Sequence, residues 1–237
     1  MISVCIATYN GQRFIEHQIK SILSQLSYED EIIVSDDGSS DGTLNVLDKI
    51  NDKRIRVIDG AHQHSPIWNF EKSLKQARGE YVFLSDQDDL WMPEKVEVMM
   101  RHLQQYDCVI SDNKIIDAGD EVVGESFYAL NGTHPGRYYN LLIKNGYLGC
   151  CMAFRRNVLE ASMPFPPDIP MHDIWIGNVA AFCFTCCFIP DKLMLYRRHG
   201  GNASTASSPS TYSFWEKIRF RLIMVYRILM LKRTEKR

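Results

Sequence analysis

The sequence predicts an α/β fold with a mostly parallel central sheet flanked by helices. Continuous apolar runs at 2–7, 31–35 and 81–85 are typical of strands that are covered on both faces of a parallel sheet. Segments with apolar residues at helical spacing alternate with these runs, as right-handed crossover connections require. In addition, clusters of polar residues follow several of the runs directly.

The length and amino-acid composition are those of a globular protein. The chain has 237 residues, 45% of them hydrophobic and 24% charged, which is enough for one large domain or two small ones. The net charge of −2 provides no general attraction to nucleic acid. Because the first residues lack a basic segment and no apolar run reaches about 18 residues, we expect a cytoplasmic protein without signal peptide or transmembrane helix. Cys183 and Cys186 have the spacing of half a zinc site, but their apolar surroundings favour core packing of reduced thiols.

The first half of the chain contains the predicted alternation of strands and helices. Ser39 or Ser40 can cap the second helix, Gly79 ends the third, and Pro93 suits the first position of the fourth. In order, we predict strands at 2–7, 31–35, 55–58, 81–85 and 108–111, and helices at 15–26, 44–50, 67–77 and 93–106.

After residue 112 the pattern changes, and four prolines within 163–170 exclude a regular element there. The other segments are a polar stretch at 117–125, a loop at 131–136, a mixed glycine and cysteine segment at 146–156, a helix at 173–184 and a strand at 193–196. Nothing between the halves resembles a linker. We therefore expect one domain over 1–203, with halves at 1–112 and 113–203.

The C-terminal part, 204–237, differs in composition. A loop rich in Ser, Thr and Pro covers 204–213, and 212–237 contains eight Lys or Arg and two Glu among apolar and aromatic residues. A basic amphipathic helix of this type can lie in a membrane interface. The alternative is a helix docked on the core with a solvated basic tail.

Three acidic residues, Asp86, Asp88 and Asp89, follow a buried strand. Like charges this close raise each other's pKa unless a cation lies among them, and carboxylate oxygens suit Mg²⁺ or Mn²⁺. A solvated acidic loop is the alternative. Since 8–10 and 36–38 are polar segments that also follow strands, all three segments should meet in one crevice at the carboxyl edge of the sheet.

The segments Val4–Asn10, Val34–Thr43 and Leu84–Trp91 resemble the three signatures of family 2 glycosyltransferases, which have the GT-A fold. The resemblance covers about residues 1–200 and also includes Gly149–Phe154, His172-Asp173 and Tyr196–His199. The Ser-Asp-Gln-Asp-Asp-x-Trp sequence is most similar to the bacterial rhamnosyltransferase-like branch. The resemblance implies inverting transfer of a sugar from a UDP- or dTDP-sugar to a glycan or lipid-linked acceptor, in polysaccharide or lipopolysaccharide synthesis at the inner face of the cell membrane.

The resemblance also implies roles for individual residues, with 1–112 holding the nucleotide and 113–203 the acceptor. The donor nucleotide would contact Ala7, Thr8, Tyr9, Asn10, Asp37, Asp86 and Gln87. A divalent metal, Mg²⁺ or Mn²⁺, would bind Asp88 and His199. The general base would be Asp173, and the acceptor would contact Trp91, Gly149, Cys150, His172 and Trp175.

Other interpretations of these residues remain open. Asp37 is also typical of a turn before a helix, Asp173 of a helix N-cap, and His199 of a surface loop. Arg197 and Arg198 would either bind phosphates or be solvated. The family usually has Glu-Asp where this chain has His-Asp, and the His could alter the pKa of the Asp. A sugar nucleotidyltransferase would need a glycine-rich basic loop after the first strand, whereas a non-catalytic GT-A-like binding protein would have lost the acids.

Overall fold

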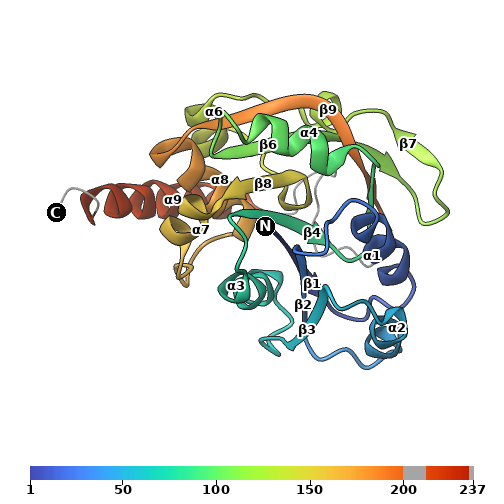
Figure 1. The fold of residues 1–237 in the computed structure, drawn as a ribbon. Helices are drawn as coiled ribbons and strands as arrows, with labels where there is room; N and C mark the ends of the chain where they lie inside the picture. The colour runs from blue at the N-terminus through green and yellow to red at the C-terminus, as the bar shows by residue number, and fades with distance from the viewer. Residues whose placement is uncertain (200–211, 235–237) are drawn as a thin grey trace.

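One sheet forms the centre of the molecule in the computed structural model, which describes residues 1–199 and 212–234 (Figure 1). The strand order is β3-β2-β1-β4-β8-β6-β9-β5, and β7 pairs with β6. The strands are β1 (Ile2–Thr8), β2 (Glu31–Asp36), β3 (Ile55–Asp59), β4 (Tyr81–Asp86), β5 (Leu90–Trp91), β6 (Cys108–Ile116), β7 (Val122–Gly124), β8 (Met152–Arg155) and β9 (Cys186–Arg197). The helices are α1 (Ile15–Leu23), α2 (Thr43–Ile50), α3 (Pro66–Gln76), α4 (Lys95–His102), α5 (Phe127–Asn131), α6 (Arg137–Leu142), η1 (Gly149–Cys151), α7 (Arg156–Ser162), α8 (His172–Cys183) and α9 (Phe214–Thr234).

The first four long strands form the expected parallel arrangement. β1 lies between β2 and β4, and β3 continues the sheet beyond β2. Helix α3 covers one face of these strands, and α1 and α2 lie on the other face (Figure 1). The register pairs Thr8 with Asp36 and Ala7 with Asp86. The polar ends of three strands therefore meet at one edge, as predicted.

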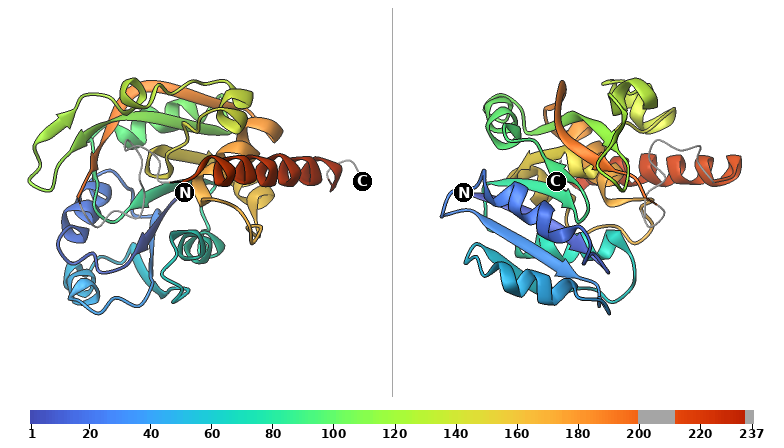
Figure 2. Two further views of the ribbon diagram at one scale, coloured as in Figure 1. Left: turned by 180° about the vertical axis from the view of Figure 1, so that it is seen from behind. Right: turned by 90° about the vertical axis from the view of Figure 1, so that its right-hand side faces the viewer.

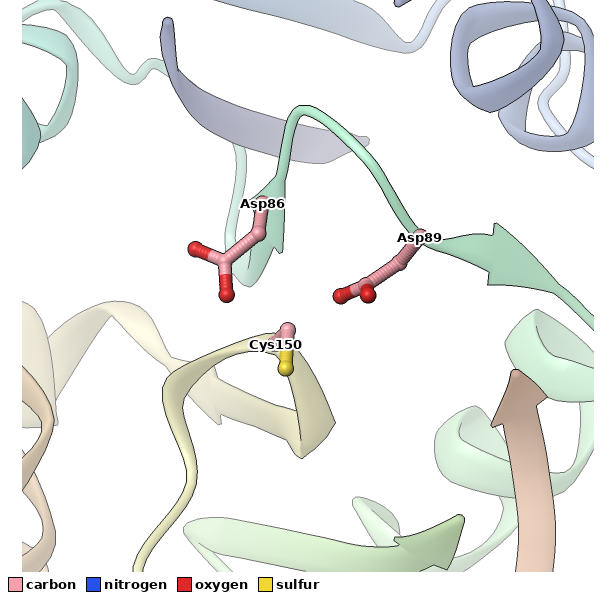
Figure 3. A group of neighbouring side chains, drawn as sticks. All are labelled: Asp86, Asp89 and Cys150. Carbon is pink, nitrogen blue, oxygen red and sulfur yellow. The ribbon is translucent and has the colours of Figure 1, made fainter. Parts of the chain in front are cut away.

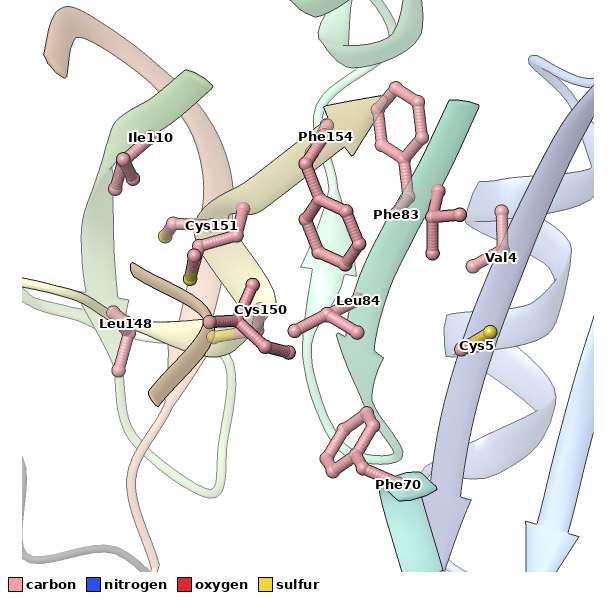
Figure 4. Close-up of a cluster of buried hydrophobic side chains, with 14 of the residues drawn as sticks. Val4, Cys5, Phe70, Phe83, Leu84, Ile110, Leu148, Cys150, Cys151 and Phe154 are labelled. Atoms are coloured by element: carbon pink, nitrogen blue, oxygen red, sulfur yellow. The ribbon is translucent and has the colours of Figure 1, made fainter. Parts of the chain in front are cut away.

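The second half makes the sheet mixed. β8 inserts between β4 and β6 and runs antiparallel to both, whereas β6 and β9 are parallel. Met152, Ala153 and Phe154 of β8 are fully buried, which explains the absence of alternation in this segment. Figure 4 shows how Phe154 continues the apolar packing from Phe83 of β4 towards Cys151, so that one hydrophobic core spans both halves.

Several predicted boundaries are corrected by tertiary contacts. Helix α2 begins after Gly42 without a side-chain cap, because Ser39 instead donates its hydroxyl to Asp36. Helix α4 is shorter than predicted. Its N-cap is Glu94, so it begins at Lys95 and Pro93 is not its first residue. Strand β9 is much longer than 193–196, and the short elements α5, α6, α7 and β8 were not predicted because each is too brief to show a periodicity. The domain limits at 112 and 203 remain predictions.

Helix α9 docks on the body and also exposes an apolar face. Met224 and Ile228 are buried, and the helix contacts α8 and α6. Its C-terminal end projects from the rest of the molecule (Figure 2). Within the described ranges, no helix combines the length and apolar content required to cross a bilayer. The predicted loop over 204–213 lies almost entirely outside the described residues.

Candidate active site

A pocket lies at the carboxyl edge of β1, β2 and β4, and the first turn of α8 completes its wall. Of the predicted site residues, it is lined by Ala7, Thr8, Tyr9, Asp37, Asp86, Gln87, Asp88, Gly149, His172 and Asp173. The lining also includes His64, Ser65, Pro66, Asn69, Phe70, Leu148, Met171 and Tyr196, which the sequence analysis did not identify. The segment 64–66 follows β3 at the same sheet edge, so the strand-end argument could have found it.

The loops after β1 and β4 are joined by the side-chain amide of Gln87. Its Oε1 accepts hydrogen bonds from the Thr8 hydroxyl and from the Tyr9 N–H, the latter at 2.9 Å. Its Nε2 donates to the Tyr9 carbonyl at 3.1 Å. Gln87 therefore fixes the backbone that carries the Tyr9 ring, which is itself 42% exposed and available for contact with a flat ligand.

Asp37 anchors the opposite wall of the pocket. Its carboxylate accepts hydrogen bonds from the N–H groups of Gln63 and Ser65, at 3.3 and 3.1 Å. These contacts hold the segment that carries His64, whose ring centroid lies 4.6 Å from that of Tyr9. Two aromatic rings and an acceptor-only carboxylate thus border one end of the pocket.

The acidic segment lies in the middle of the pocket wall. Burial raises the pKa of Asp86 to about 7, and the charges of Asp88 and Asp173 add to this effect. Burial also raises the pKa of Asp89, whose Oδ1 accepts the Arg197 N–H at 2.9 Å. Carboxylates that raise each other's pKa in this way form a set that a divalent cation would stabilise.

Two sets of side chains are candidate metal ligands. Figure 3 shows Asp86 and Asp89 facing a space bordered by Cys150, with ligand atoms within 4.8 Å of one another. Burial raises the pKa of the Cys150 thiol well above its usual value, and a protonated thiol is a poor ligand for Mg²⁺ or Mn²⁺. The other set contains Asp88 and His199, whose Oδ2 and Nε2 atoms lie 2.7 Å apart. The Asp88 carboxylate suits Mg²⁺ or Mn²⁺ and this set contains no protonated thiol, so the second set fits the predicted metal better.

Asp173 is the second residue of α8. Its two carboxylate oxygens accept hydrogen bonds from the Gly149 N–H at 3.1 Å and the Ile174 N–H at 2.7 Å. Burial raises the pKa of Asp173 to about 6. The N-cap residue of the helix is Met171, so capping does not account for Asp173. A fixed carboxylate with a pKa near neutrality is suited to accept a proton.

Comparison with known sequences identifies the family. A model described as "Glycosyl transferase family 2" matches residues 3–162. The chain belongs to glycosyltransferase family 2. Among its relatives are the UDP-Glc:alpha-D-GlcNAc-diphosphoundecaprenol beta-1,3-glucosyltransferase WfgD of Escherichia coli, 26% identical over 82% of this chain and 77% of that protein, and the dTDP-rhamnosyl transferase RfbG of Shigella flexneri, 25% identical over 83% and 72%.

Solved structures show that the fold is GT-A. S. aureus TarS 1–349 in complex with UDP-GlcNAc matches with a TM-score of 0.69 at 20% identity, over 94% of this chain and 66% of that one. The mannosyltransferase PcManGT from Pyrobaculum calidifontis in complex with GDP-Man and Mn²⁺ has a TM-score of 0.63 at 20% identity, over 86% and 58%. The chain thus spans 66% and 58% of the length of these two structures.

Within this family 2 glycosyltransferase, three residues predicted to contact the acceptor lie in the core instead. Trp91 is 4% exposed and packs between Phe83 and the Lys95 ammonium. Trp175 is 3% exposed and donates its indole N–H to the Ser162 carbonyl. Cys150 is fully buried. Burial leaves almost none of the surface of these three side chains accessible to a sugar.

Two other predicted contacts are also corrected. Asn10 is not in the pocket lining, and its Oδ1 instead accepts the Ser40 N–H at 2.9 Å. The Arg197 guanidinium is neither solvated nor directed at the pocket. It pairs with Asp120 at 2.5 Å and donates to the Asp88 carbonyl at 2.7 Å, so it supports the acidic loop from behind.

Proposed function

We propose that this glycosyltransferase moves a sugar from a UDP- or dTDP-sugar to a hydroxyl group of a glycan or lipid-linked acceptor, with inversion at the anomeric carbon. The observation that carries the proposal is the convergence of Asp37, Asp86, Asp88 and Asp173 on one pocket. WfgD, which is named for transfer to a GlcNAc-diphosphoundecaprenol acceptor, supports a place in cell-surface polysaccharide or lipopolysaccharide synthesis.

Each end of the pocket has its own task in this proposal. The nucleobase lies against Tyr9, and the Asp37 carboxylate accepts the N3–H of uracil or thymine, because a carboxylate can only accept. Ala7, Thr8 and Asp86 border the ribose and the diphosphate. Asp88 and His199 would hold a divalent ion, and its positive charge would stabilise the leaving diphosphate.

Asp173 serves as the general base. The acceptor oxygen forms a bond to the anomeric carbon while the bond from that carbon to the diphosphate oxygen breaks. Asp173 takes the hydroxyl proton as this occurs, and attack from the face opposite the diphosphate inverts the configuration. The N–H groups of Gly149 and Ile174 keep the carboxylate in one orientation during the transfer.

The test is turnover of a panel of UDP- and dTDP-sugars with Mn²⁺. We expect one sugar nucleotide to be hydrolysed slowly without acceptor and rapidly with a short-chain GlcNAc-diphospholipid. Pyrophosphate release from UTP and a sugar 1-phosphate would instead show a nucleotidyltransferase. Tight UDP binding without turnover of any donor would show a non-catalytic binding protein.

We also propose that the protein associates with the cytoplasmic face of the membrane through α9. Trp215, Leu222, Tyr226 and Leu229 are all exposed, and their spacing of three, four and seven residues places them on the face opposite Met224. Arg219 lies on the same face and is exposed. Exposed apolar and aromatic side chains beside a base suit an anionic lipid surface.

The neighbouring helix α6 carries further exposed apolar side chains. The Arg221 side chain of α9 donates to the carbonyl of Ile143, the residue after α6, and Ile143 is 59% exposed. Tyr138 and Leu142 of α6 are exposed as well. A lipid-linked acceptor held in the membrane would then be presented beside the domain that uses it.

A further inference from the structure

Lys95 is a fully buried lysine near the acidic segment, and the proposed mechanism does not use it. It is the first residue of α4, and its exposed fraction is 0%. Burial of an ammonium group is unfavourable, and so is its place at the positive N-terminal end of a helix. Because lysine is almost never fully buried unless its charge is compensated, this position requires a reason beyond packing.

The ammonium group of Lys95 lies between an aromatic ring and a backbone carbonyl. Its Nζ atom is 4.6 Å from the centroid of the Trp91 ring and donates a hydrogen bond to the Cys150 carbonyl at 2.7 Å. Burial lowers the pKa of Lys95, and the neighbouring thiols and the carboxylates of Asp89 and Asp86 oppose that effect. The face of Trp91 and the carbonyl oxygen are both groups that stabilise a cation.

The Cys150 carbonyl belongs to η1, the three-residue turn that also contacts Asp173. Gly149 begins this turn, and its N–H donates to Oδ2 of Asp173 at 3.1 Å. The turn and the start of α8 fit closely, since a Cβ atom at Gly149 would lie 3.3 Å from the Cβ atom of Asp173. A displacement of η1 would therefore change the orientation of the Asp173 carboxylate.

We propose that Lys95 is a positioning residue for Asp173. The ammonium group fixes η1 through the Cys150 carbonyl, and η1 keeps the carboxylate in the orientation that accepts the acceptor proton. The proposal rests on the glycosyl transfer proposed above, in which Asp173 is the base. Lys95 is not in the pocket lining, so it acts through the turn and not on a substrate. The alternative role is a counter-charge for Asp86 and Asp89, which would change the affinity for UDP and Mn²⁺ instead of kcat.

The experiment compares two substitutions of equal length. Lys95→Met keeps an unbranched apolar stem beside Trp91 and removes the ammonium group, whereas Lys95→Gln keeps an N–H donor. Lys72→Met, at an exposed lysine of α3, is the matched control. Kinetics measure transfer with whichever of UDP-glucose, UDP-GlcNAc and dTDP-rhamnose the wild type uses, calorimetry measures binding of UDP with Mn²⁺, and thermal unfolding measures Tm.

The loss should fall on kcat. We expect kcat to decrease roughly 10- to 100-fold in Lys95→Met, as for a misplaced catalytic group, and less in Lys95→Gln. The KM for the donor and the affinity for UDP should remain those of the wild type. The Tm should not decrease, because an apolar side chain in place of a buried charge generally preserves stability.

A double-mutant cycle identifies the residue through which Lys95 acts. Both Lys95 variants are combined with Asp173→Asn, and transfer is measured with the same donor and acceptor. If Lys95 orients the base, its substitution should lower kcat much less once the base is absent. A general role in the core would lower kcat by the same factor with and without Asp173.

Four results would overturn the role of Lys95 while leaving the glycosyl transfer intact. They are wild-type kcat in both variants, equal factors in the two backgrounds of the cycle, a loss of UDP affinity or Tm that parallels the loss of activity, and failure of both variants to fold. A wild type that uses no sugar nucleotide refutes the glycosyl transfer itself, and the role of Lys95 with it.

Discussion

Oδ2 of Asp88 lies 2.7 Å from Nε2 of His199, although 111 residues separate them in the chain. Burial raises the pKa of Asp88, and the hydrogen bond and charge of His199 oppose that shift. Asp88→Asn should therefore abolish transfer and weaken Mn²⁺-dependent UDP binding, with little change in folding. Asp48→Asn, on the exposed side of α2, is the matched control and should behave as wild type. Full activity of Asp88→Asn, or of the wild type in excess chelator, would remove the metal from the mechanism.

Asp173→Asn should lower kcat by about 10²- to 10⁴-fold, the typical contribution of general-base catalysis. UDP affinity should hardly change, because Tyr9 and Asp37 border the end of the pocket that we propose holds the nucleotide. In the wild type, kcat should rise with pH through an inflection near 6, since the base works only when deprotonated. Transfer within about threefold of wild type in the variant would place the base elsewhere. Asp168 is not such an alternative, because it pairs with Arg227 and is not in the pocket lining.

The stability of the protein should also depend on the ionisation of the Asp173 carboxylate. The pKa of Asp173 is about 6 in the fold and 3.8 for an ordinary Asp, so ionisation opposes folding above pH 6 and has no such effect below about 4. Asp173→Asn removes this penalty, on the order of 2–3 kcal/mol, but loses one of the two N–H bonds at every pH. The Tm of the variant minus that of the wild type should consequently increase between pH 4 and pH 8. A difference that is constant with pH would show that the carboxylate is solvated.

Asp37 should determine which nucleobase the pocket prefers. UDP presents an N3–H to its carboxylate, whereas CDP presents a bare N3 acceptor at that position. We expect the wild type to prefer UDP, and Asp37→Asn to reduce the UDP-to-CDP affinity ratio roughly tenfold, as expected for a hydrogen bond to a charged group. The comparison of both nucleotides on one preparation corrects for any general damage to the loop that Asp37 holds through Gln63 and Ser65. An unchanged ratio would exclude contact of Asp37 with the base.

The exposed face of α9 should bind anionic vesicles. Replacing Trp215 and Leu222 together by Ser should lower sedimentation with phosphatidylglycerol vesicles about tenfold or more, because two apolar contacts with the interface are lost. Tyr28→Ser removes an equally exposed aromatic residue, 87% accessible, elsewhere on the surface and is the control. Binding should weaken as salt increases. The membrane proposal is wrong if the wild-type chain does not bind vesicles at low salt, or if the double variant changes only self-association. This face would then contact another copy of the chain.

The sequence alone was sufficient for the parallel strands of the first half of the fold and for the edge where the pocket lies. β1, β2 and β4 are continuous apolar runs, and a strand covered on both faces must be apolar along its length. Because parallel strands present their carboxyl ends at one edge, polar residues such as Thr8, Asp37 and Asp86 could be placed together without coordinates. The family motifs then extended the prediction to Asp88, Asp173 and His199.

Only the tertiary structure decided the second half and the environment of each side chain. The short strand β8 is antiparallel to both of its neighbours, which are strands far away in the chain. Local periodicity does not record such pairing. For the same reason the sequence could not show that Trp91 and Trp175 are buried, or that the ring nitrogens of His172 are buried without a hydrogen-bond partner among the described residues. Burial is a property of what packs against a residue, and the residues that pack there come from distant parts of the chain.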